Sequence, residues 1–391
     1  MNNLDEKKLV DAMNQSLNEP DPPVKPMLRM KHISHLDLDG YGAVLLSEFL
    51  LKFFPEGAMT LESVNILPNK LIPEMQETLN NIDNYDLVVI TDLAVNQNLV
   101  DMVNNHPDGK KVLVFDHHLC EIGDLPENFI VTEQSPIKKD KLTCATELYY
   151  NFIRNDSVYS LFDHRPDVRK AIAYFVECVR VYDTFEFWST RNEPANEIDM
   201  CYYDAPRLNT LFHVMERDEF KDYVKHYINS RNWEFLTMSN EAYPWISKVL
   251  ELEQNKNVKY VESAIRRMTK TPFKYTVYKN GEVHKMDYEI GVIFAEKSSP
   301  IIANTALERN EDIAFCAVVS NNQVSIYSNK PDVDVSKIAR VFGGGGHKEA
   351  AGFTIPYINA GVFNMQHFEK IIMCAGQLIP SDLYEEDSTN E

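Results

Sequence analysis

The sequence predicts an α/β fold, in which a doubly wound parallel-sheet domain is joined by a helical connector to a smaller α/β domain. In the first half, short continuous apolar runs, typical of strands buried on both faces, alternate with helical patterns. A charged, helical stretch follows, and a second set of strand-like runs begins near Phe273. At 391 residues the chain is long enough for two domains.

Three apolar runs of the first half deliver acidic or imidazole side chains just past their carboxyl ends. They are Met27–Ser34 before His35, Asp37 and Asp39, Leu87–Thr91 before Asp92, and Val112–Phe115 before Asp116, His117 and His118. Open α/β sheets keep their sites at the carboxyl ends of the strands, so we expect these groups to meet. Because crowded, buried carboxylates repel one another, divalent cations are the expected counter-charge.

The remaining segments complete the predicted organisation. Strands are expected at 63–67, 129–132, 288–294, 313–319 and 323–328, and helices at 42–51, 71–79, 98–104, 143–154, 167–181, 205–214, 218–228, 240–252 and 335–341. We divide the chain into a loose N-terminal arm (1–26), a first α/β domain (27–191), the helical connector (192–270), a smaller second domain (271–375) and an acidic tail (376–391).

Composition limits the partners and the compartment. The formal charge of −20, from 59 acidic against 39 basic residues, argues against a broad basic surface for long duplex DNA and favours a short substrate. No run approaches the roughly 20 apolar residues of a membrane span, and no signal peptide is visible. The six cysteines form no CxxC pair. We therefore expect reduced thiols in a cytoplasmic protein without a membrane partner.

The acids and histidines suit a pair of divalent cations. Hard cations such as Mg²⁺ or Mn²⁺ prefer carboxylate oxygens, and imidazole shifts the choice toward Mn²⁺. In two-metal phosphoryl hydrolases, two such ions about 3.5–4 Å apart polarise a phosphoryl oxygen and activate a water molecule. Asp92, on a neighbouring strand end, is our choice for the bridging ligand. The candidate ligands are His35, Asp37, Asp39, Asp92, His117 and Asp183.

Each signal alone also has an ordinary structural explanation. Asp-x-Asp-Gly is most often a plain turn, Asp92 could cap a helix, and adjacent histidines usually pack in a core or at a surface. The run Gly343–Gly346 could turn successive N–H groups toward a phosphate, or could be a flexible loop or a helix C-cap. Their joint occurrence at three strand ends favours the functional interpretation.

The motifs His35-Leu-Asp-Leu-Asp-Gly40, Asp92, Asp116-His117-His118 and Asp183 resemble those of the DHH phosphoesterase superfamily. The run Gly343-Gly-Gly-Gly-His-Lys-Glu-Ala-Ala-Gly-Phe353 resembles the signature of the DHH-associated domain, and the first motif is similar to that of NrnB-type oligoribonucleases. The resemblance implies that residues 27–191 form a catalytic domain and residues 271–375 a substrate-binding domain. It also implies the metal ligands given above, with His118 as a donor to the scissile phosphate and with Asp116 orienting His117 or its neighbour. It also implies substrate contacts by Gly344, Gly345, Gly346, His347 and Lys348.

One departure from that family concerns the strand before the glycine run. Some relatives carry an arginine there, where this chain has Tyr327, so the contact to a terminal phosphate is in doubt. Tyr327 is our candidate for a substrate contact at this position. Arg266, Arg267 and Arg340 are alternative cations.

The resemblance implies a metal-dependent 3′–5′ exonuclease that degrades short single-stranded RNA or DNA to 5′-mononucleotides, and relatives often form homodimers. The first alternative is a hydrolase of small phosphoesters, such as linear or cyclic dinucleotides or 3′,5′-bisphosphorylated adenosine. A second alternative, from another class, is a non-catalytic nucleic-acid-binding scaffold.

Overall fold

The computed structural model describes most of the chain, in two compact units comprising residues 1–250 and 251–391. The described residues are 28–51, 57–120, 122–155, 166–191, 193, 199–229, 237, 241–279, 282–297, 299–320, 323–331 and 333–354. The expected N-terminal arm (1–26) and acidic tail (376–391) lie outside them.

The first unit is built on a five-stranded parallel sheet with the order β2-β1-β3-β4-β5. The strands are β1 (Leu28–Ser34), β2 (Met59–Asn65), β3 (Leu87–Thr91), β4 (Val112–Asp116) and β5 (Phe129–Val131). The chain moves outward from β1 to β2 and then returns to the other side of β1 with β3. This reversal between β1 and β3 is the switch point at which such sheets hold their ligands.

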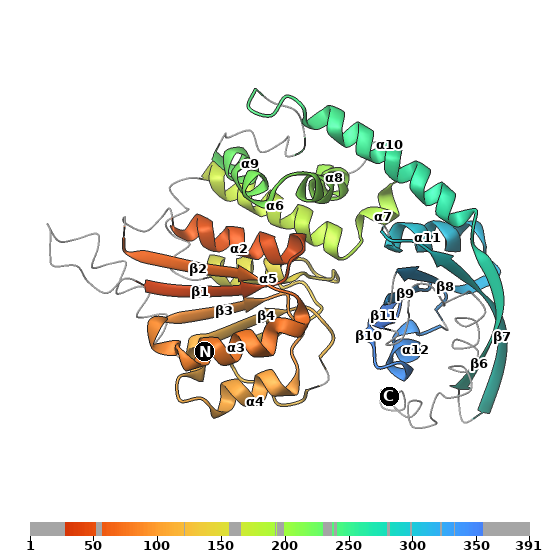
Figure 1. The fold of residues 1–391 in the computed structure, drawn as a ribbon, viewed down its shortest axis with the longest axis horizontal. Coiled ribbons are helices and arrows are strands. Elements are labelled where there is room, and N and C mark those ends of the chain that lie inside the picture. Colours follow the sequence, from red (N-terminus) through yellow and green to blue (C-terminus); the bar gives the residue numbers. More distant parts are fainter. Residues whose placement is uncertain are drawn as a thin grey trace, which may run out of the picture. The chain divides into compact units, whose positions relative to one another are not determined.

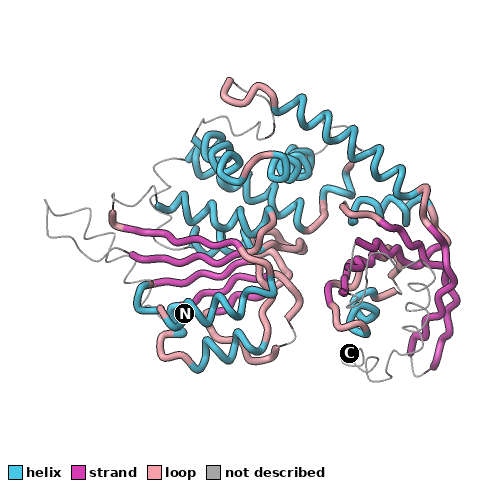
Figure 2. The backbone as a smooth tube through the Cα atoms, viewed as in Figure 1, coloured by secondary structure: helices cyan, strands magenta, loops and turns pink. Residues whose placement is uncertain are grey.

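Helices cover both faces of this sheet, which confirms the predicted doubly wound α/β class (Figure 1). One face carries α2 (Leu38–Leu51), α5 (Ala145–Asn155) and α6 (Pro166–Asp183), and the other carries α3 (Leu71–Asn80) and α4 (Gln97–Asn105). Next to α6 lie the short α7 (Phe187–Thr190), α8 (Met200–Val214) and α9 (Arg217–Asn229). Figure 2 shows the loops gathered at the carboxyl ends of the strands.

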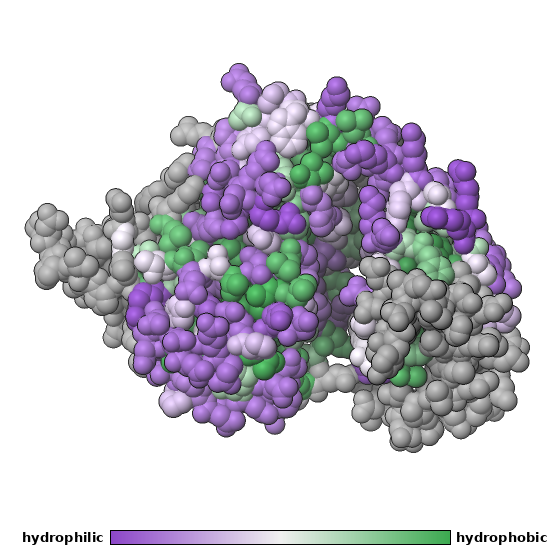
Figure 3. Space-filling view, viewed as in Figure 1, coloured by the Kyte–Doolittle hydropathy of each residue, from purple (hydrophilic) through white to green (hydrophobic). Residues whose placement is uncertain are grey.

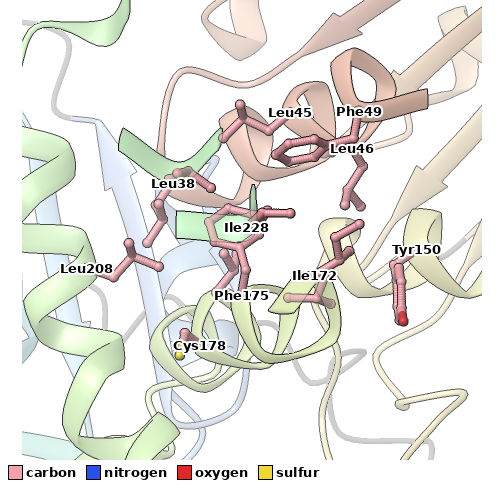
Figure 4. Packing of buried hydrophobic residues seen from close by; sticks show 14 of the residues in the cluster. Leu38, Leu45, Leu46, Phe49, Tyr150, Ile172, Phe175, Cys178, Leu208 and Ile228 are labelled. Carbon is pink, nitrogen blue, oxygen red and sulfur yellow. The ribbon is translucent and has the colours of Figure 1, made fainter. Parts of the chain in front are cut away.

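The larger core lies between α2, α5, α6, α8 and α9 (Figure 4). In this core Leu45, Phe175 and Leu208 are all fully buried. Gly42 lets α2 approach α5, because a Cβ at this position would come within 2.7 Å of the Thr146 hydroxyl. That close approach brings the N-terminus of α5 to the start of α2, where Asp39 lies.

The second unit is built on a mixed six-stranded sheet with the order β10-β11-β9-β8-β7-β6. Its strands are β6 (Thr269–Lys279), β7 (Glu282–Phe294), β8 (Ile313–Ser320), β9 (Gln323–Tyr327), β10 (Gly345–Gly346) and β11 (Ala350–Thr354). Only β7 and β8 pair in parallel, and α11 (Ser299–Arg309) connects them. One hydrophobic cluster joins α10 (Ile246–Ile265) and α11 to the sheet, and a separate one joins α12 (Val335–Val341) to it.

The helix predicted at 240–252 differs most from the structure, in which α10 runs from Ile246 to Ile265. Its second half is rich in charge, so the apolar pattern weakens, yet Val261 and Ala264 pack into a cluster of the second unit. Tertiary packing therefore extends this helix beyond the predicted end.

On the face drawn in Figure 3, hydrophilic residues cover most of the described surface. The five described cysteines are free thiols, as expected from their spacing. No helix among the described residues has both the length and the apolar character that crossing a lipid bilayer requires.

Leu208→Ala tests whether α8 is an integral part of the core of the first unit. Removing a fully buried leucine side chain should lower the free energy of unfolding by about 2–5 kcal/mol. The matched control is Leu252→Ala on α10, whose leucine is 49% exposed and should change stability by no more than about 0.5 kcal/mol. Calorimetry measures both changes, and equal effects would contradict the described packing.

Candidate functional site

The loop after β1 folds back on itself and presents two acids and a histidine. Asp37 Oδ1 accepts a hydrogen bond from the Gly40 amide at 3.0 Å, and Asp37 Oδ2 lies 2.8 Å from His35 Nδ1. A Cβ at position 40 would come within 2.4 Å of the His35 carbonyl oxygen. Glycine is therefore required for the tight turn that aims Asp37 and Asp39 past the end of the sheet. The ordinary turn interpretation of Asp-x-Asp-Gly is correct as local structure.

Asp92 follows β3 in a left-handed conformation, with φ of 57°. Only a few per cent of residues other than glycine have positive φ, and such strain concentrates at functional sites. The Asp92 amide donates to the carbonyl oxygen of Phe115 on β4 at 3.1 Å, which fixes the turn. Asn96, and not Asp92, caps α4, so the capping explanation of Asp92 is wrong.

Asp39 is fully buried and is tied to the N-terminus of α5. Its two carboxylate oxygens accept hydrogen bonds from the amides of Ala145, at 2.7 Å, and Thr146, at 2.8 Å. The Thr146 hydroxyl donates back to the Asp39 carbonyl oxygen at 2.6 Å. A helix N-terminus stabilises negative charge, and the two amides of α5 hold the Asp39 carboxylate in a fixed orientation. Each carboxylate oxygen keeps a second lone pair for a cation.

His117 connects these acids to the C-terminus of α6. Its Nε2 lies 3.4 Å from an oxygen of Asp92, 3.4 Å from one of Asp183 and 3.8 Å from one of Asp39. Asp183 comes from the last residue of a helix, whereas the other ligand candidates follow strands. Each of the six predicted ligands thus has a carboxylate or imidazole atom within 4.8 Å of those of at least two others, and His35 contacts Asp37 and Asp92.

The ligand atoms form three overlapping groups, each within 4.8 Å. The groups are His35-Asp37-Asp92, Asp39-His117-Asp183 and Asp92-His117-His118. Asp92 and His117 are each shared by two of the groups. Of the two, Asp92 is the carboxylate, whose two oxygens can serve two cations, as a bridging ligand requires.

His118 is held by Asp116. Its Nδ1 lies 2.6 Å from Asp116 Oδ1, while the other oxygen of Asp116 accepts from the Val95 amide at 3.2 Å. Asp116 is fully buried, and it contacts His118 and not the neighbouring His117. The carboxylate therefore fixes the orientation of the His118 ring and leaves Nε2 as its other proton site.

Electrostatics in the site reflect the crowding of negative charge. Burial and the charges of Asp37 and Asp39 raise the pKa of Asp92 well above its usual range. Burial raises the pKa of Asp183 to about 7, although His117 opposes the shift. Burial tends to lower the pKa of His35, but the hydrogen bond to Asp37 and the nearby Asp92 outweigh it and raise that pKa to about 10.

Burial and nearby carboxylates also have opposite effects on the pKa values of His117 and His118. For His117, burial is outweighed by the charges of Asp183 and Asp39, and its pKa is raised. For His118, the hydrogen bond to Asp116 outweighs burial and raises the pKa, whereas that bond lowers the pKa of Asp116 despite its burial. Without added positive charge, the cluster retains protons on its histidines and on part of its carboxylates.

These residues fit a divalent metal centre. Asp92 Oδ2 and Asp183 Oδ2 are buried and have no hydrogen-bond partner within the described part of the chain. Buried carboxylate oxygens without partners are costly, and a cation would satisfy them. The donor set of oxygens with imidazole nitrogens suits Mn²⁺ or Mg²⁺.

A buried polar network beneath the site was not identified from the sequence. His32 on β1 lies within 2.9 Å of the Thr91 hydroxyl and 2.8 Å of the Ser47 hydroxyl. Ser34 donates to the carbonyl oxygens of Gly40 and Thr91. Burial lowers the pKa of His32 to about 3, so its ring stays neutral. The network joins the ends of β1 and β3. In the sequence, the feature that could have indicated it is His32, a histidine inside an apolar run.

The run Gly343–Gly346 lies partly at the end of a helix and partly in a short strand. Gly343, with φ of 73°, follows the C-terminal end of α12, and the amides of Gly343 and Gly344 donate to carbonyl oxygens of Arg340 and Ala339. The helix C-cap alternative is therefore correct for this part of the run. Gly345 and Gly346 form β10, which pairs with β11.

The other predicted substrate contacts lie near this hairpin. His347 and Lys348 are exposed in the turn between β10 and β11. Tyr327, at the end of β9, packs against the cluster formed with α10 and α11, and burial raises the pKa of Tyr327 to about 12.

Comparisons with known proteins agree with this fold. The family model of the DHHA1 domain matches residues 288–372. The fold over 97% of the chain resembles that of exonuclease RecJ bound to manganese, with a TM-score of 0.54 and 15% identity over 95% of that chain. The chain therefore carries a C-terminal DHHA1 domain, resembles proteins of the DHH superfamily and is a hydrolase of phosphodiester bonds.

Within this class, two curated relatives cover most of the chain. Oligoribonuclease NrnB from Bacillus subtilis (strain 168) is 29% identical over 330 residues, which is 83% of this chain and 73% of that protein. The 3′,5′-cyclic-nucleotide phosphodiesterase of Helicobacter pylori (strain ATCC 700392 / 26695) is 22% identical over 355 residues, 83% of this chain and 92% of that protein.

Asp92→Asn tests the metal centre through stability. In EDTA at neutral pH this variant should be more stable than the wild type, because the raised pKa of Asp92 means that folding must take up a proton which the unfolded chain releases. Asparagine also tolerates the positive φ. Mn²⁺ should stabilise the wild type, by about 2.7 kcal/mol at 100 times Kd for one site, and the variant much less. Thermal unfolding with and without Mn²⁺ measures both effects.

The matched control is Asp101→Asn on the surface of α4, which should keep the full stabilisation by Mn²⁺. An Asp92→Asn variant that gained as much stability from Mn²⁺ as the wild type would contradict the assignment of Asp92 as a ligand.

Asp183→Asn tests the pH dependence of the metal-free protein. The raised pKa of Asp183, about 7, means that the folded state holds a proton that the unfolded chain releases near pH 4. The contribution of Asp183 to stability therefore falls as the pH rises from about 4 to about 7. In EDTA, the stability of Asp183→Asn relative to the wild type should increase from pH 5 to pH 8. An unchanged difference between the two melting temperatures would refute this.

Proposed function

We propose that the protein is a 3′–5′ exonuclease that removes 5′-mononucleotides from short single-stranded oligonucleotides, using two divalent cations, Mn²⁺ in preference to Mg²⁺. The observation that carries the proposal is the sharing of Asp92 between two ligand groups at the β1/β3 switch point. The similarity to an oligoribonuclease over most of the chain supports the substrate class.

The proposed ligands divide into two sets around Asp92. His35 and Asp37 would hold one cation, and Asp39, His117 and Asp183 the other, with Asp92 between them. When bound, the cations supply Lewis-acid polarisation of the scissile phosphate and a nucleophile at neutral pH. The protein holds these ligands rigidly through the turn at Gly40, the strained Asp92 and the N-terminus of α5.

His118 is the proposed general acid. Asp116 holds the His118 Nδ1 position and raises the pKa of the ring, so the imidazolium persists near neutral pH. Its Nε2–H would donate a proton to the leaving O3′ of the upstream nucleotide as the P–O3′ bond breaks. The phosphate then leaves on the released 5′-mononucleotide, and the upstream oligonucleotide ends in a new 3′-hydroxyl.

A second candidate is hydrolysis of small cyclic or linear phosphodiesters, because a curated relative is a 3′,5′-cyclic-nucleotide phosphodiesterase. The same ligands and the same acid would serve that reaction, since a 3′,5′-cyclic phosphate also contains a P–O3′ bond. The two candidates differ in the number of phosphates that the site must accept.

Digestion of 5′-labelled RNA and DNA ladders of two to twenty-four nucleotides with Mn²⁺ tests the proposal. The wild type should shorten the short oligomers one nucleotide at a time from the 3′ end, so labelled intermediates appear in order of decreasing length. Asp92→Ala should lose activity by at least about 10³-fold because both ligand groups lose an oxygen, while its circular dichroism spectrum is unchanged.

The control variant is Asp101→Ala, which should match the wild type. A labelled mononucleotide as the first product would reverse the direction of cleavage. Activity on cyclic nucleotides alone would replace the first candidate with the second, and wild-type rates for Asp92→Ala would refute the ligand assignment.

A further inference from the structure

Arg217, the first residue of α9, lies between two aromatic rings of the first unit. Its guanidinium carbon is 3.7 Å from the centroid of the Phe212 ring and 5.5 Å from that of the Tyr41 ring. Its Nη1 donates to the Phe212 carbonyl oxygen at the end of α8. The side chain is half-buried. Two rings and a carbonyl oxygen therefore hold the guanidinium in one place and use one of its five N–H groups.

Arg217 has no carboxylate within ion-pairing distance in the described part of the chain. Elsewhere in the same unit, Arg29 pairs with Asp86 at 3.0 Å and Arg180 pairs with Glu186 at 2.7 Å. An immobilised guanidinium that is left without a counter-ion is available to an anionic ligand.

Tyr41 joins Arg217 to the metal-ligand loop. It lies in the first turn of α2, two residues after Asp39, and its amide donates to the Asp37 carbonyl oxygen at 3.0 Å. The electrostatics of His213, on α8, show the same proximity. Burial and the charge of Arg217 lower the pKa of His213, while Asp37 opposes this shift. Arg217 therefore belongs to the surroundings of the candidate metal site.

The neighbouring cations do not offer an equivalent group. Lys221 also lies over the Tyr41 ring, at 5.8 Å, but it pairs with Glu48 at 2.8 Å. Lys225 pairs with the same carboxylate at 2.6 Å. A guanidinium also binds phosphate through two parallel hydrogen bonds, which an ammonium cannot do. Of Arg217, Lys221 and Lys225, Arg217 therefore has the charged group that fits a phosphate best.

We propose that Arg217 binds a second phosphate of the substrate, adjacent to the one that is cleaved, and that it thereby selects oligonucleotides over diesters with a single phosphate. This inference rests on the proposed function for the identity of the substrate. Tyr41 and Phe212 act as positioning residues, because they hold the guanidinium beside the metal-ligand loop and away from bulk water. The site thus gains one local cation in a chain whose overall charge repels polyanions.

Kinetics with two substrates test the proposal. A 5′-phosphorylated dinucleotide carries two phosphates, and bis(p-nitrophenyl) phosphate carries one. For Arg217→Gln, kcat/KM on the dinucleotide should fall about 10- to 100-fold, the usual effect of losing a hydrogen bond to a charged group. The loss on the single-phosphate substrate should be about tenfold smaller or less. Arg217→Lys should recover part of the dinucleotide activity, and Arg29→Gln, remote from the site, should match the wild type.

Binding without metal provides a second readout. Fluorescence anisotropy in EDTA measures the affinity for a labelled, 5′-phosphorylated pentanucleotide at several salt concentrations. Losing one phosphate contact should reduce the slope of log Kd against log salt by about 0.7 for a single strand. This measurement depends on Arg217 and not on catalysis, so it separates the two proposals.

The outcomes are distinct. Equal losses on both substrates for Arg217→Gln, or an unchanged salt slope, would show that Arg217 merely caps α8, and would overturn its proposed role. If the wild type cleaves bis(p-nitrophenyl) phosphate but no oligonucleotide, the proposed function fails, and the salt slope alone then decides the role of Arg217. No binding of the pentanucleotide by the wild type would also overturn the inference.

Discussion

The structure depends on holding four carboxylates together against their mutual repulsion. Asp37, Asp39, Asp92 and Asp183 meet around His117 in a largely buried volume, where the electrostatic cost of negative charge is highest. Three features of the fold meet this cost. The α5 N-terminus neutralises part of the charge of Asp39, and protonated histidines offset part of the rest. The third is the strained turn at Asp92, which keeps that carboxylate in place.

The strand reversal between β1 and β3 makes this arrangement rigid. Because the two strands are adjacent and parallel, their ends are joined by the hydrogen bonds of Ser34, Thr91 and His32 beneath the ligand loops. His32 stays neutral because it is buried, so this network adds no charge to the cluster above it. The ligands therefore stand on a base that hydrogen bonds fix, and a cation meets a site that is already organised. Little ordering entropy then remains to oppose its binding.

The sequence predicts the strand ends and their acids well, because a strand that is buried on both faces of a parallel sheet is a continuous apolar run in the sequence. It predicts less of what depends on distant contacts. The capping of α5 by Asp39 joins residues more than one hundred positions apart, and the φ of Asp92 follows from its bond to β4. Arg217 carries no local pattern, since its environment comes from Tyr41 on another helix. In the glycine run, the end of α12 is local and predictable, whereas the pairing of β10 with β11 is not.

The acidic site and a polyanionic substrate would repel each other without added positive charge. Cations held by the proposed ligands would reverse the sign of the local charge. They would also satisfy the oxygens of Asp92 and Asp183 that have no hydrogen-bond partner in the described part of the chain. The same acids that destabilise the metal-free fold thus become favourable when a cation binds, which couples metal binding to stability. Arg217 contributes a charge that does not depend on metal, so an oligonucleotide can be held in register beside the cluster. The remaining acidic surface then disfavours long nucleic acids, which would extend beyond these few positive groups.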